Sequence, residues 1–272
     1  MKIRLDQYLV QHGLIQSRER AKAMIMSGVV FVNEQKVDKA GEMIKGDAKV
    51  EVRGHDIGYV SRGGLKMEGA LNAFPVSAEG KVCLDIGAST GGFTDCLLQH
   101  GAARVHAIDV GTNQLVWKLR QDPRVIVKEK FNARYMTPED IGEQVDLIVS
   151  DVSFISLKKI LPAAFPLLKK EGDALVLIKP QFEAGREKVG KKGVVRDPDV
   201  HLEVLENFLT HAKDSGFTVL DITFSPIRGP EGNIEYLGYL ESGDWVEKTF
   251  DLQGLVEQSH AALDHGKEGA GC

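Results

Sequence analysis

Four charged residues stand where an open α/β sheet would gather them into one crevice. Asp151 and Lys179 each follow directly after an apolar run that reads as a buried strand. Lys66 stands on the helix expected before the first strand of that sheet, and Glu235 opens the last strand. Ligands and catalysis in such sheets lie beyond the carboxyl ends of the strands, so we expect these side chains to meet there.

The opposing interpretation is that each residue is a solvated charge at the end of an element. Most lysines and glutamates at such positions are solvated, and for Lys66 taken alone this is the stronger interpretation. Lys179 is harder to explain in this way. It lies between an apolar strand and Pro180 and has little freedom to reach solvent.

The stretch Val82–Leu98 has the form of a strand, a glycine loop and a helix. Its first five residues are an apolar run ending in a carboxylate, as expected of a buried parallel strand. Gly87, Gly91 and Gly92 then form a tight loop before helical spacing begins. Glycines let the backbone approach a ligand closely, and the start of the helix offers free N–H groups.

The glycine spacing favours one class of ligand. The loop lacks the G-x-G-x-x-G pattern that seats a dinucleotide pyrophosphate. Asp85 lies just before the turn, and Asp109 follows the next apolar run. Its separation from the glycine loop along the sequence is about that at which an acidic residue binds a ribose hydroxyl in such folds. Asp-x-Gly-x-x-x-Gly-Gly with a second acid resembles the S-adenosylmethionine-binding motif of Rossmann-like methyltransferases; the alternative is a generic α/β turn with no ligand. The expected cofactor contacts are Asp85, Gly87, Ala88, Ser89, Thr90, Gly91, Gly92, Phe93, Asp109 and Asp151.

Charge is distributed unevenly along the chain. The 272 residues carry a net charge of −5, yet residues 1–66 hold 12 Lys/Arg and 8 Asp/Glu, a net of +4. This asymmetry indicates a small basic module attached to an acidic body. Cys83, Cys96 and Cys272 fit neither a disulfide framework nor a metal site, so we expect no metal and a reducing cytoplasm. No signal peptide or membrane span is visible.

The N-terminal segment reads as two short helices and a small sheet. We expect helices over residues 5–14 and 18–27, the second capped by Ser17, and strands over 29–32, 36–37 and 49–52. Arg18, Arg20 and Lys22 lie on the polar face of the second helix. The segment resembles the S-four-type RNA-binding module over roughly residues 3 to 52; the alternative is that these charges are only a solvated helix face.

The remainder alternates strands and helices, which predicts a mostly parallel, doubly wound sheet. Residues 54–61 read as a linker, and a helix is expected over 65–74. Strands are expected over 82–86, 104–109, 125–128, 146–150, 174–178, 218–224 and 236–240, with helices over 93–99, 115–120, 157–168, 200–215 and 251–263. The short connection between the last two strands forces an antiparallel pair, as in Rossmann-like S-adenosylmethionine-dependent methyltransferases with seven strands. Residues 266–272 should be disordered.

Five segments carry a closer resemblance. They are Ser61-Arg62-Gly63-Gly64-Leu65-Lys66, Asp85 to Thr94, Ser150 to Leu157, Lys179-Pro180-Gln181-Phe182-Glu183 and Gly232-Asn233-Ile234-Glu235-Tyr236. Their order and content resemble the TlyA family, called hemolysins in older naming, in which an FtsJ-type ribose methyltransferase is fused to an S-four-type module. The resemblance implies S-adenosylmethionine-dependent 2′-O-methylation of cytidines in ribosomal RNA or ribosomal subunits. It also implies a catalytic tetrad of Lys66, Asp151, Lys179 and Glu235.

The implied reaction explains why such a tetrad would be needed. A ribose 2′-hydroxyl is a poor nucleophile at neutral pH, so a group must hold or take its proton. A buried lysine near another cation can lose its own proton near neutral pH. Lys179 could be the base, with Asp151 and Glu235 fixing its position and Lys66 as the neighbouring cation. Alternatively, all four residues only orient the hydroxyl, since in-line methyl transfer depends strongly on alignment.

The expected organisation is an RNA-binding module and linker over residues 1–59, a methyltransferase domain over 60–245, and a helix and tail over 246–272. The basic loop 186–192 follows the Lys179 motif and could hold RNA phosphates or be a flexible solvated loop. Expected RNA contacts are Arg4, Arg18, Arg20, Lys22, Arg62, Arg186, Lys188, Lys191 and Lys192. Two other functions compete with this interpretation: a membrane-lytic protein, and an RNA-binding protein whose methyltransferase domain is inactive.

Overall fold

The computed structural model describes residues 2–26, 28–53 and 57–264. Its main feature is a seven-stranded sheet in the order β11-β12-β10-β9-β6-β7-β8, in which β12 runs antiparallel to both of its neighbours. The seven-stranded mixed sheet and the antiparallel last pair are therefore confirmed. The strands are β6 (Val82–Ile86), β7 (Arg104–Ile108), β8 (Val125–Lys128), β9 (Val145–Ser150), β10 (Leu168–Ile178), β11 (Phe217–Phe224) and β12 (Tyr236–Ser242).

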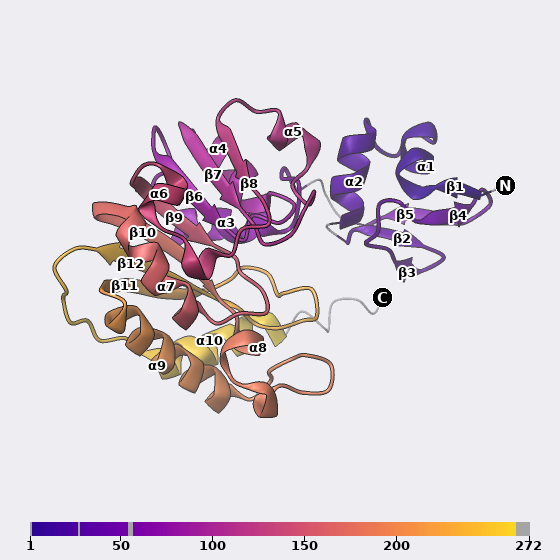
Figure 1. Cartoon of the computed structure of the whole chain (residues 1–272). Coiled ribbons are helices and arrows are strands. Elements are labelled where there is room, and N and C mark those ends of the chain that lie inside the picture. Colours follow the sequence, from indigo (N-terminus) through magenta and orange to yellow (C-terminus); the bar gives the residue numbers. More distant parts are fainter. Residues whose placement is uncertain (1, 27, 54–56, 265–272) are drawn as a thin grey trace.

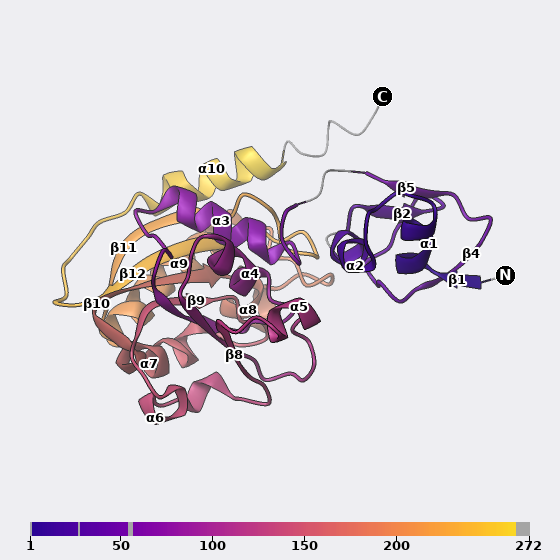
Figure 2. The ribbon, with the colours of Figure 1, turned by 90° about the horizontal axis from the view of Figure 1, so that it is seen from above.

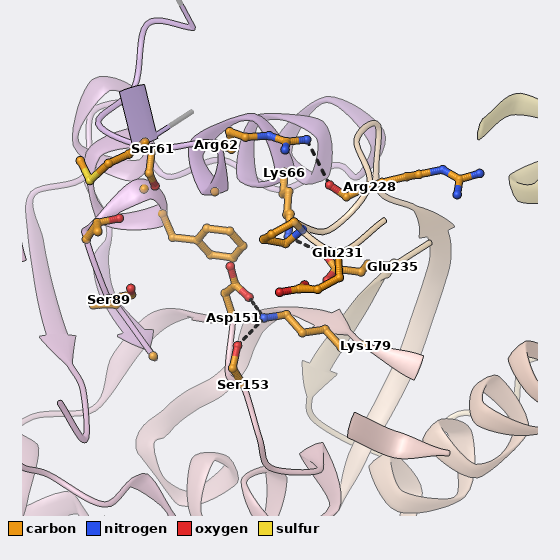
Figure 3. A pocket seen from close by; sticks show the side chains of 18 of the residues that line it. Ser61, Arg62, Lys66, Ser89, Asp151, Ser153, Lys179, Arg228, Glu231 and Glu235 are labelled. Carbon is orange, nitrogen blue, oxygen red and sulfur yellow. Dashed lines mark hydrogen bonds and ion pairs between the residues drawn. The ribbon is translucent and has the colours of Figure 1, made fainter. Parts of the chain in front are cut away.

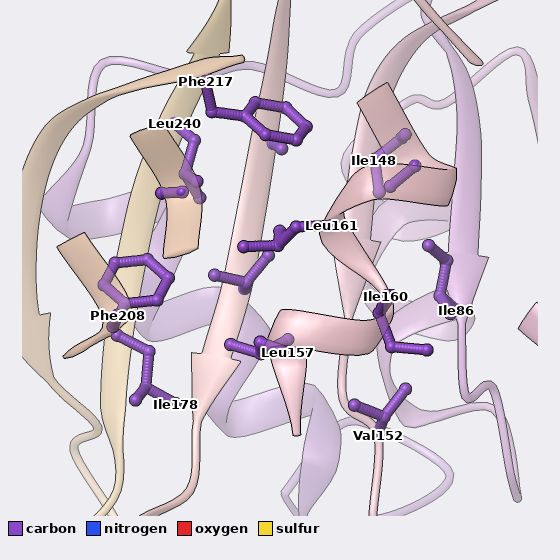
Figure 4. Packing of buried hydrophobic residues seen from close by; sticks show 14 of the residues in the cluster. Ile86, Ile148, Val152, Leu157, Ile160, Leu161, Ile178, Phe208, Phe217 and Leu240 are labelled. Carbon is purple, nitrogen blue, oxygen red and sulfur yellow. The ribbon is translucent and has the colours of Figure 1, made fainter. Parts of the chain in front are cut away.

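Helices cover both faces of this sheet, because alternate residues of each buried strand point to opposite faces. Cys83 packs with α3 (Gly63–Ala73), α4 (Gly92–Gln99) and α5 (Trp117–Arg120) on one face. Leu84 and Ile86 pack on the other face with α7 (Leu161–Ala164), α9 (Pro198–Asp214) and α10 (Leu252–Asp264). Figure 4 shows this second core, where Phe208 of α9 lies against Leu240 and Ile178 of the sheet.

The N-terminal module stands apart from the large sheet, with α2 on the side that faces it (Figures 1 and 2). A core that includes Leu5, Leu9 and Ile25 holds it together. Ser17 accepts a hydrogen bond from the Arg20 backbone N–H, as expected of a helix cap. Its elements are β1 (Lys2–Arg4), α1 (Leu5–Gln11), α2 (Arg18–Met26), β2 (Val30–Val32), β3 (Gln35–Lys36), β4 (Met43–Lys45) and β5 (Val50–Val52).

The prediction of one continuous helix over residues 157–168 is wrong. The chain instead forms η2 (Leu157–Lys159), α7 and η3 (Phe165–Leu167), because Pro162 and Pro166 lack the N–H groups that a continuous helix needs. Short elements were also missed, namely β1, β4, η1 (Ala133–Tyr135), α6 (Pro138–Ile141), α8 (Pro180–Glu183) and η4 (Arg186–Lys188). The expected tail at 266–272, Cys272 and part of the expected linker lie outside the described residues.

Candidate active site

The carboxyl edge of the sheet brings the four charged residues into one hollow of about 410 Å³ (Figure 3). Asp151 follows β9, Lys179 follows β10, Lys66 comes from α3 and Glu235 immediately precedes β12. Glu235 reaches this edge because β12 is antiparallel, so that its beginning lies beside the ends of the parallel strands. The volume is within the range of small-molecule sites.

Lys179 is held by two partners that both come from the loop after β9. Its Nζ lies 2.5 Å from Asp151 Oδ1 and donates a hydrogen bond to Ser153 Oγ at 3.0 Å. The Lys179 side chain is only 9% exposed, so its position is set by these contacts and not by solvent. The lysine amine is therefore fixed at the floor of the hollow, beside a carboxylate.

Lys66 and Glu235 form a second pair in the same hollow. Lys66 Nζ lies 2.5 Å from Glu235 Oε2, and both side chains are buried. Glu235 Oε1 accepts a further hydrogen bond from the Gln181 amide at 3.2 Å, so both carboxylate oxygens are held. Gly229 leaves the room for this carboxylate, since a Cβ there would lie 2.7 Å from Oε1. The site thus contains two lysine–carboxylate pairs whose formal charges cancel.

The glycine loop forms the wall of the hollow next to these pairs. Gly87 has a φ of +86°, and a Cβ on it would lie 2.9 Å from the Asp151 carbonyl oxygen. Only glycine lets the loop lie this close to the loop after β9. Gly91 also has a positive φ, +99°, but a Cβ there would meet Leu119 and Leu115. Gly91 therefore serves the packing of the turn and lines neither of the hollows described here.

A second hollow of about 490 Å³ adjoins the first and shares Gly87, Ser89, Asp151 and Phe154 with it. Asp109 lies here, where its carboxylate accepts hydrogen bonds from the Ser89 and Gly111 backbone N–H groups at 2.8 and 2.6 Å. Apolar side chains make most of the remaining wall: Ile86, Ile108, Val110, Phe131, Val152, Ile155 and Ile160. An acid beside an apolar slot fits a ribose and an adenine, so the two joined hollows suit S-adenosylmethionine and a substrate.

Asp85 lies beneath the glycine loop and lines neither of these hollows. It is fully buried and accepts a hydrogen bond from the Thr94 hydroxyl at 2.6 Å. Burial, with a smaller effect of the negative charge of Asp151, raises the pKa of Asp85 to about 7, against the hydrogen bond from Thr94. Through this hydrogen bond to Thr94, Asp85 fixes the first turn of α4.

This pKa predicts how stability depends on pH. The folded protein keeps the Asp85 proton up to about pH 7, whereas the unfolded chain loses it near pH 3.9. Below pH 4 Asp85 is protonated in both states, so its titration does not lower the free energy of unfolding. As the pH rises from 4 to 7, only the unfolded chain loses the proton, and the free energy of unfolding falls. Asp85→Asn should remove this loss, so the stability of the variant relative to the parent should rise by about 4 kcal/mol between pH 4 and pH 8.

Urea unfolding at pH 4, 6 and 8 measures this difference. Asp122→Asn is the matched control, because the hydrogen bonds from Arg124 lower the pKa of the Asp122 carboxyl and should give no such rise. A pH-independent difference between Asp85→Asn and the parent would contradict the assignment.

The cations expected to contact RNA fall into two groups. Arg4 and Arg18 pair with the buried carboxylate of Asp6, at 3.0 Å in each case, while Lys22 is exposed. Burial opposes ionisation of Asp6, but hydrogen bonds from both arginines hold its pKa below the usual value. These two arginines therefore help to hold the module together, whatever else they bind.

In the second group only Arg62 lines the first hollow, while the cations of the loop 186–192 line separate depressions. Arg62 donates a hydrogen bond to the Arg228 carbonyl at 3.2 Å (Figure 3). Arg186 lies beside Phe154 and Phe182 in a shallow depression. Lys188 pairs with Glu203 of α9 at 2.5 Å, whereas the side chains of Lys191 and Lys192 are exposed.

Several residues of the site carried no signal in the sequence. Ser153 and Gln181 lie inside recognised motifs, but nothing marked their side chains as partners of Lys179 and Glu235. Asn132 and Phe131 of the second hollow follow β8 in an irregular segment with no motif. Met26, Lys36 and Asp38 of the N-terminal module also line the first hollow. Only the tertiary structure brings these residues to the site.

The sheet order, the glycine loop after β6 and the acid after β7 define the class of S-adenosylmethionine-dependent methyltransferases. A solved Listeria monocytogenes structure shares this fold at 16% identity, with a TM-score of 0.51 over 66% of this chain and 98% of that one. Residues 59–242 match the model of the FtsJ-like methyltransferase family, and residues 3–50 match that of the S4 domain. The chain belongs to the FtsJ-like methyltransferases, in the TlyA family that joins them to an S4 domain.

Relatives match over nearly the whole length. Bacillus subtilis YqxC is 49% identical over 98% of this chain and 97% of its own. The 16S/23S rRNA (cytidine-2′-O)-methyltransferase TlyA of Mycobacterium tuberculosis is 41% identical over 97% of this chain and 98% of its own. A solved Streptococcus thermophilus structure, provisionally described as a hemolysin, is 46% identical with a TM-score of 0.79, covering 98% of each chain.

Within residues 2–26, 28–53 and 57–264, no helix has the length and hydropathy needed to cross a membrane. The same part of the chain contains no cluster of three or more His, Cys, Asp or Glu residues arranged to hold a metal ion.

Proposed function

We propose that this protein transfers a methyl group from S-adenosylmethionine to the 2′-hydroxyl of cytidines in ribosomal RNA. The observation that carries the proposal is the pair of lysine–carboxylate contacts in one hollow, directly beside the glycine loop. The relative from Mycobacterium tuberculosis, named for this reaction on 16S and 23S rRNA, supports the choice of substrate. A substrate of this kind supports a cytoplasmic location, where ribosomes are found.

S-adenosylmethionine supplies an electrophilic methyl group when bound. The residues of this chain that would hold it are Asp109 at the ribose, the apolar wall of the second hollow at the adenine, and Gly87 to Thr90 at the methionine part. Asp85 supports this loop from beneath through Thr94. We assign Gly91, Gly92 and Phe93 to the shape of the loop and of its helix.

Lys179 acts on the ribose hydroxyl in this proposal. Its Nζ either accepts the hydroxyl proton or donates a hydrogen bond that orients the oxygen, and both roles require a fixed amine. Asp151 and Ser153 supply that fixation, and Lys66 with Glu235 forms the opposite wall. Alignment of the hydroxyl then contributes much of the rate, since effective molarities in well-oriented reactions are large.

The proposal assigns a separate role to each part of the chain. Residues 1–59 would bind RNA, residues 60–245 would bind the cofactor and catalyse transfer, and residues 246–272 would complete the fold through α10. RNA phosphates would contact Arg20, Lys22, Arg62 and the loop 186–192, since phosphate contacts supply most of the affinity.

RNA affinity should therefore fall steeply with salt, and single cations should each contribute to the slope. Lys22→Ala should reduce the slope of log K against log salt by about 1, because one fewer phosphate is neutralised. Lys170→Ala is the matched control, since this exposed lysine lies near the start of β10, away from the carboxyl edge. Filter binding to ribosomal RNA over a salt series measures both slopes. Equal slopes for parent and Lys22→Ala would remove Lys22 from the RNA surface.

The proposed reaction is tested by the product that it makes. Ribosomal RNA incubated with the protein and S-adenosylmethionine should yield 2′-O-methylcytidine on digestion to nucleosides, detected by mass spectrometry. Methyl groups only on bases, or no transfer to RNA from a folded protein that binds the cofactor, would contradict it.

A further inference from the structure

Glu183 is a half-buried acidic residue beside the site that the proposed transfer does not use. It ends α8, four residues after Lys179. Burial raises the pKa of its carboxyl above the ordinary value, although two hydrogen bonds act in the opposite direction. Among the described residues no cation forms an ion pair with it. A carboxylate that is shielded from water and has no cation beside it lowers stability unless hydrogen bonds offset the loss of its hydration.

Both oxygens of Glu183 bind the start of η2. The Ser156 hydroxyl donates to Oε2 at 2.6 Å, and the Leu157 backbone N–H donates to Oε1 at 2.8 Å. Ser156 in turn accepts a hydrogen bond from the Lys158 backbone N–H. The side chain therefore ties α8, after β10, to the segment after β9.

The segment that is tied down contains the partners of Lys179. Asp151 and Ser153 bind the Lys179 amine, and Phe154 packs on Phe182 of α8 with ring centroids 5.0 Å apart. Phe154 has a φ of +62° and is 91% exposed. A bulky side chain keeps such a backbone conformation only where the surrounding structure imposes it.

This loop, residues 151–156, also forms the boundary between the two hollows. Asp151, Ser153 and Phe154 line both of them. A shift of the loop would move the partners of Lys179 relative to the cofactor side of the site. A misplacement of about 1 Å, even from a change outside the reacting groups, can cost about 100-fold in rate.

We propose that Glu183 is a positioning residue for methyl transfer, which holds the loop 151–156 in its strained form and so fixes Asp151 and Ser153 against Lys179. The inference rests on the proposed function, because it assigns the effect of Glu183 to the step that Lys179 serves. Glu183 itself need not touch the substrate.

The test is single-turnover methyl transfer to ribosomal RNA at saturating S-adenosylmethionine. Glu183→Leu keeps the approximate volume but removes both acceptors, so the rate should fall by about 10- to 100-fold. Glu183→Gln keeps an acceptor for the Leu157 N–H and a polar partner for Ser156, so it should restore most of the rate. Glu206→Leu, the same change at an exposed glutamate of α9, is the matched control and should leave the rate unchanged.

Two further variants keep the test decisive. Ser156→Ala removes one of the two bonds and should give an intermediate rate, even where Glu183→Leu folds poorly. In the Asp151→Asn background, Glu183→Leu should cost little more, since both changes act on the same loop. A merely structural role for Glu183 would instead multiply the two losses.

The outcomes separate the inference from the proposed function. Parental transfer by Glu183→Leu, or transfer by Glu183→Gln as slow as by Glu183→Leu, overturns the positioning role. Multiplied losses in the double variant overturn it as well. Parental transfer by Asp151→Asn alone overturns the proposed catalytic assignment, whatever the Glu183 variants do.

Discussion

Replacing Lys179 with alanine should lower the rate of methyl transfer by about 100- to 10,000-fold, the range expected for loss of a general acid–base group. The Lys179 amine is buried, lies 2.5 Å from Asp151 and is the group that meets the ribose hydroxyl in the proposed reaction. Cofactor affinity should change little, because the proposed cofactor contacts, Asp109 and the glycine loop, are left intact. Single-turnover methylation of ribosomal RNA at saturating S-adenosylmethionine measures the step itself.

A second substitution decides which role Lys179 has. Arginine keeps the positive charge and does not lose its proton in proteins, so Lys179→Arg should be as slow as Lys179→Ala where the residue acts as a base. Activity retained only by Lys179→Arg would assign Lys179 to electrostatic positioning. Transfer at the parental rate by Lys179→Ala would show that Lys179 is only a lysine at the end of a strand.

Replacing Gly87 with alanine should weaken S-adenosylmethionine binding by about 100-fold, which corresponds to about 2.8 kcal/mol. The φ of +86° strains any residue with a Cβ, and that Cβ would lie 2.9 Å from the Asp151 carbonyl oxygen. The atom that it meets is backbone, so the glycine loop and the loop after β9 must move apart. Both hollows lose their shape, because Gly87 lines both.

Gly142→Ala provides the matched control for this prediction. Gly142 has a φ of +84°, but a Cβ there would meet nothing within 4 Å. The two variants share the backbone strain, but only Gly87→Ala adds a clash, and only Gly87 lines the hollows. Isothermal titration calorimetry should find parental cofactor affinity for Gly142→Ala and a large loss for Gly87→Ala. Parental affinity in a folded Gly87→Ala protein would show that the glycine loop does not hold the cofactor.

Much of the fold could be predicted because the sequence signals are local. The apolar runs before Asp151 and Lys179 predict buried strands, and the glycines after Asp85 predict the loop that the structure contains. The prediction of a helix over 157–168 failed because Pro162 and Pro166 lack the N–H groups that a continuous helix needs. The three-residue strands β1 and β4 were missed because so short an alternation of charged and apolar residues has no distinct period.

The tetrad could be assembled from the sequence because each member stands at the end or start of a strand or in a recognised motif. Its supporting contacts could not, since they join residues far apart in the chain. Gln181 reaches Glu235 across 54 positions, and Glu183 reaches Ser156 across 27. Asp109 illustrates the same limit, because its distance along the chain predicted a ligand contact but not that it lies in a separate hollow from Lys179.

The most direct test of the central claim maps 2′-O-methyl groups at nucleotide resolution in ribosomal RNA that lacks them. Incubation with the parent chain and S-adenosylmethionine should create new 2′-O-methyl groups at cytidines. Incubation with Lys179→Ala, or without S-adenosylmethionine, should create none. New methyl groups on bases or on other nucleosides, or the same 2′-O-methyl groups from the Lys179→Ala protein, would contradict the account.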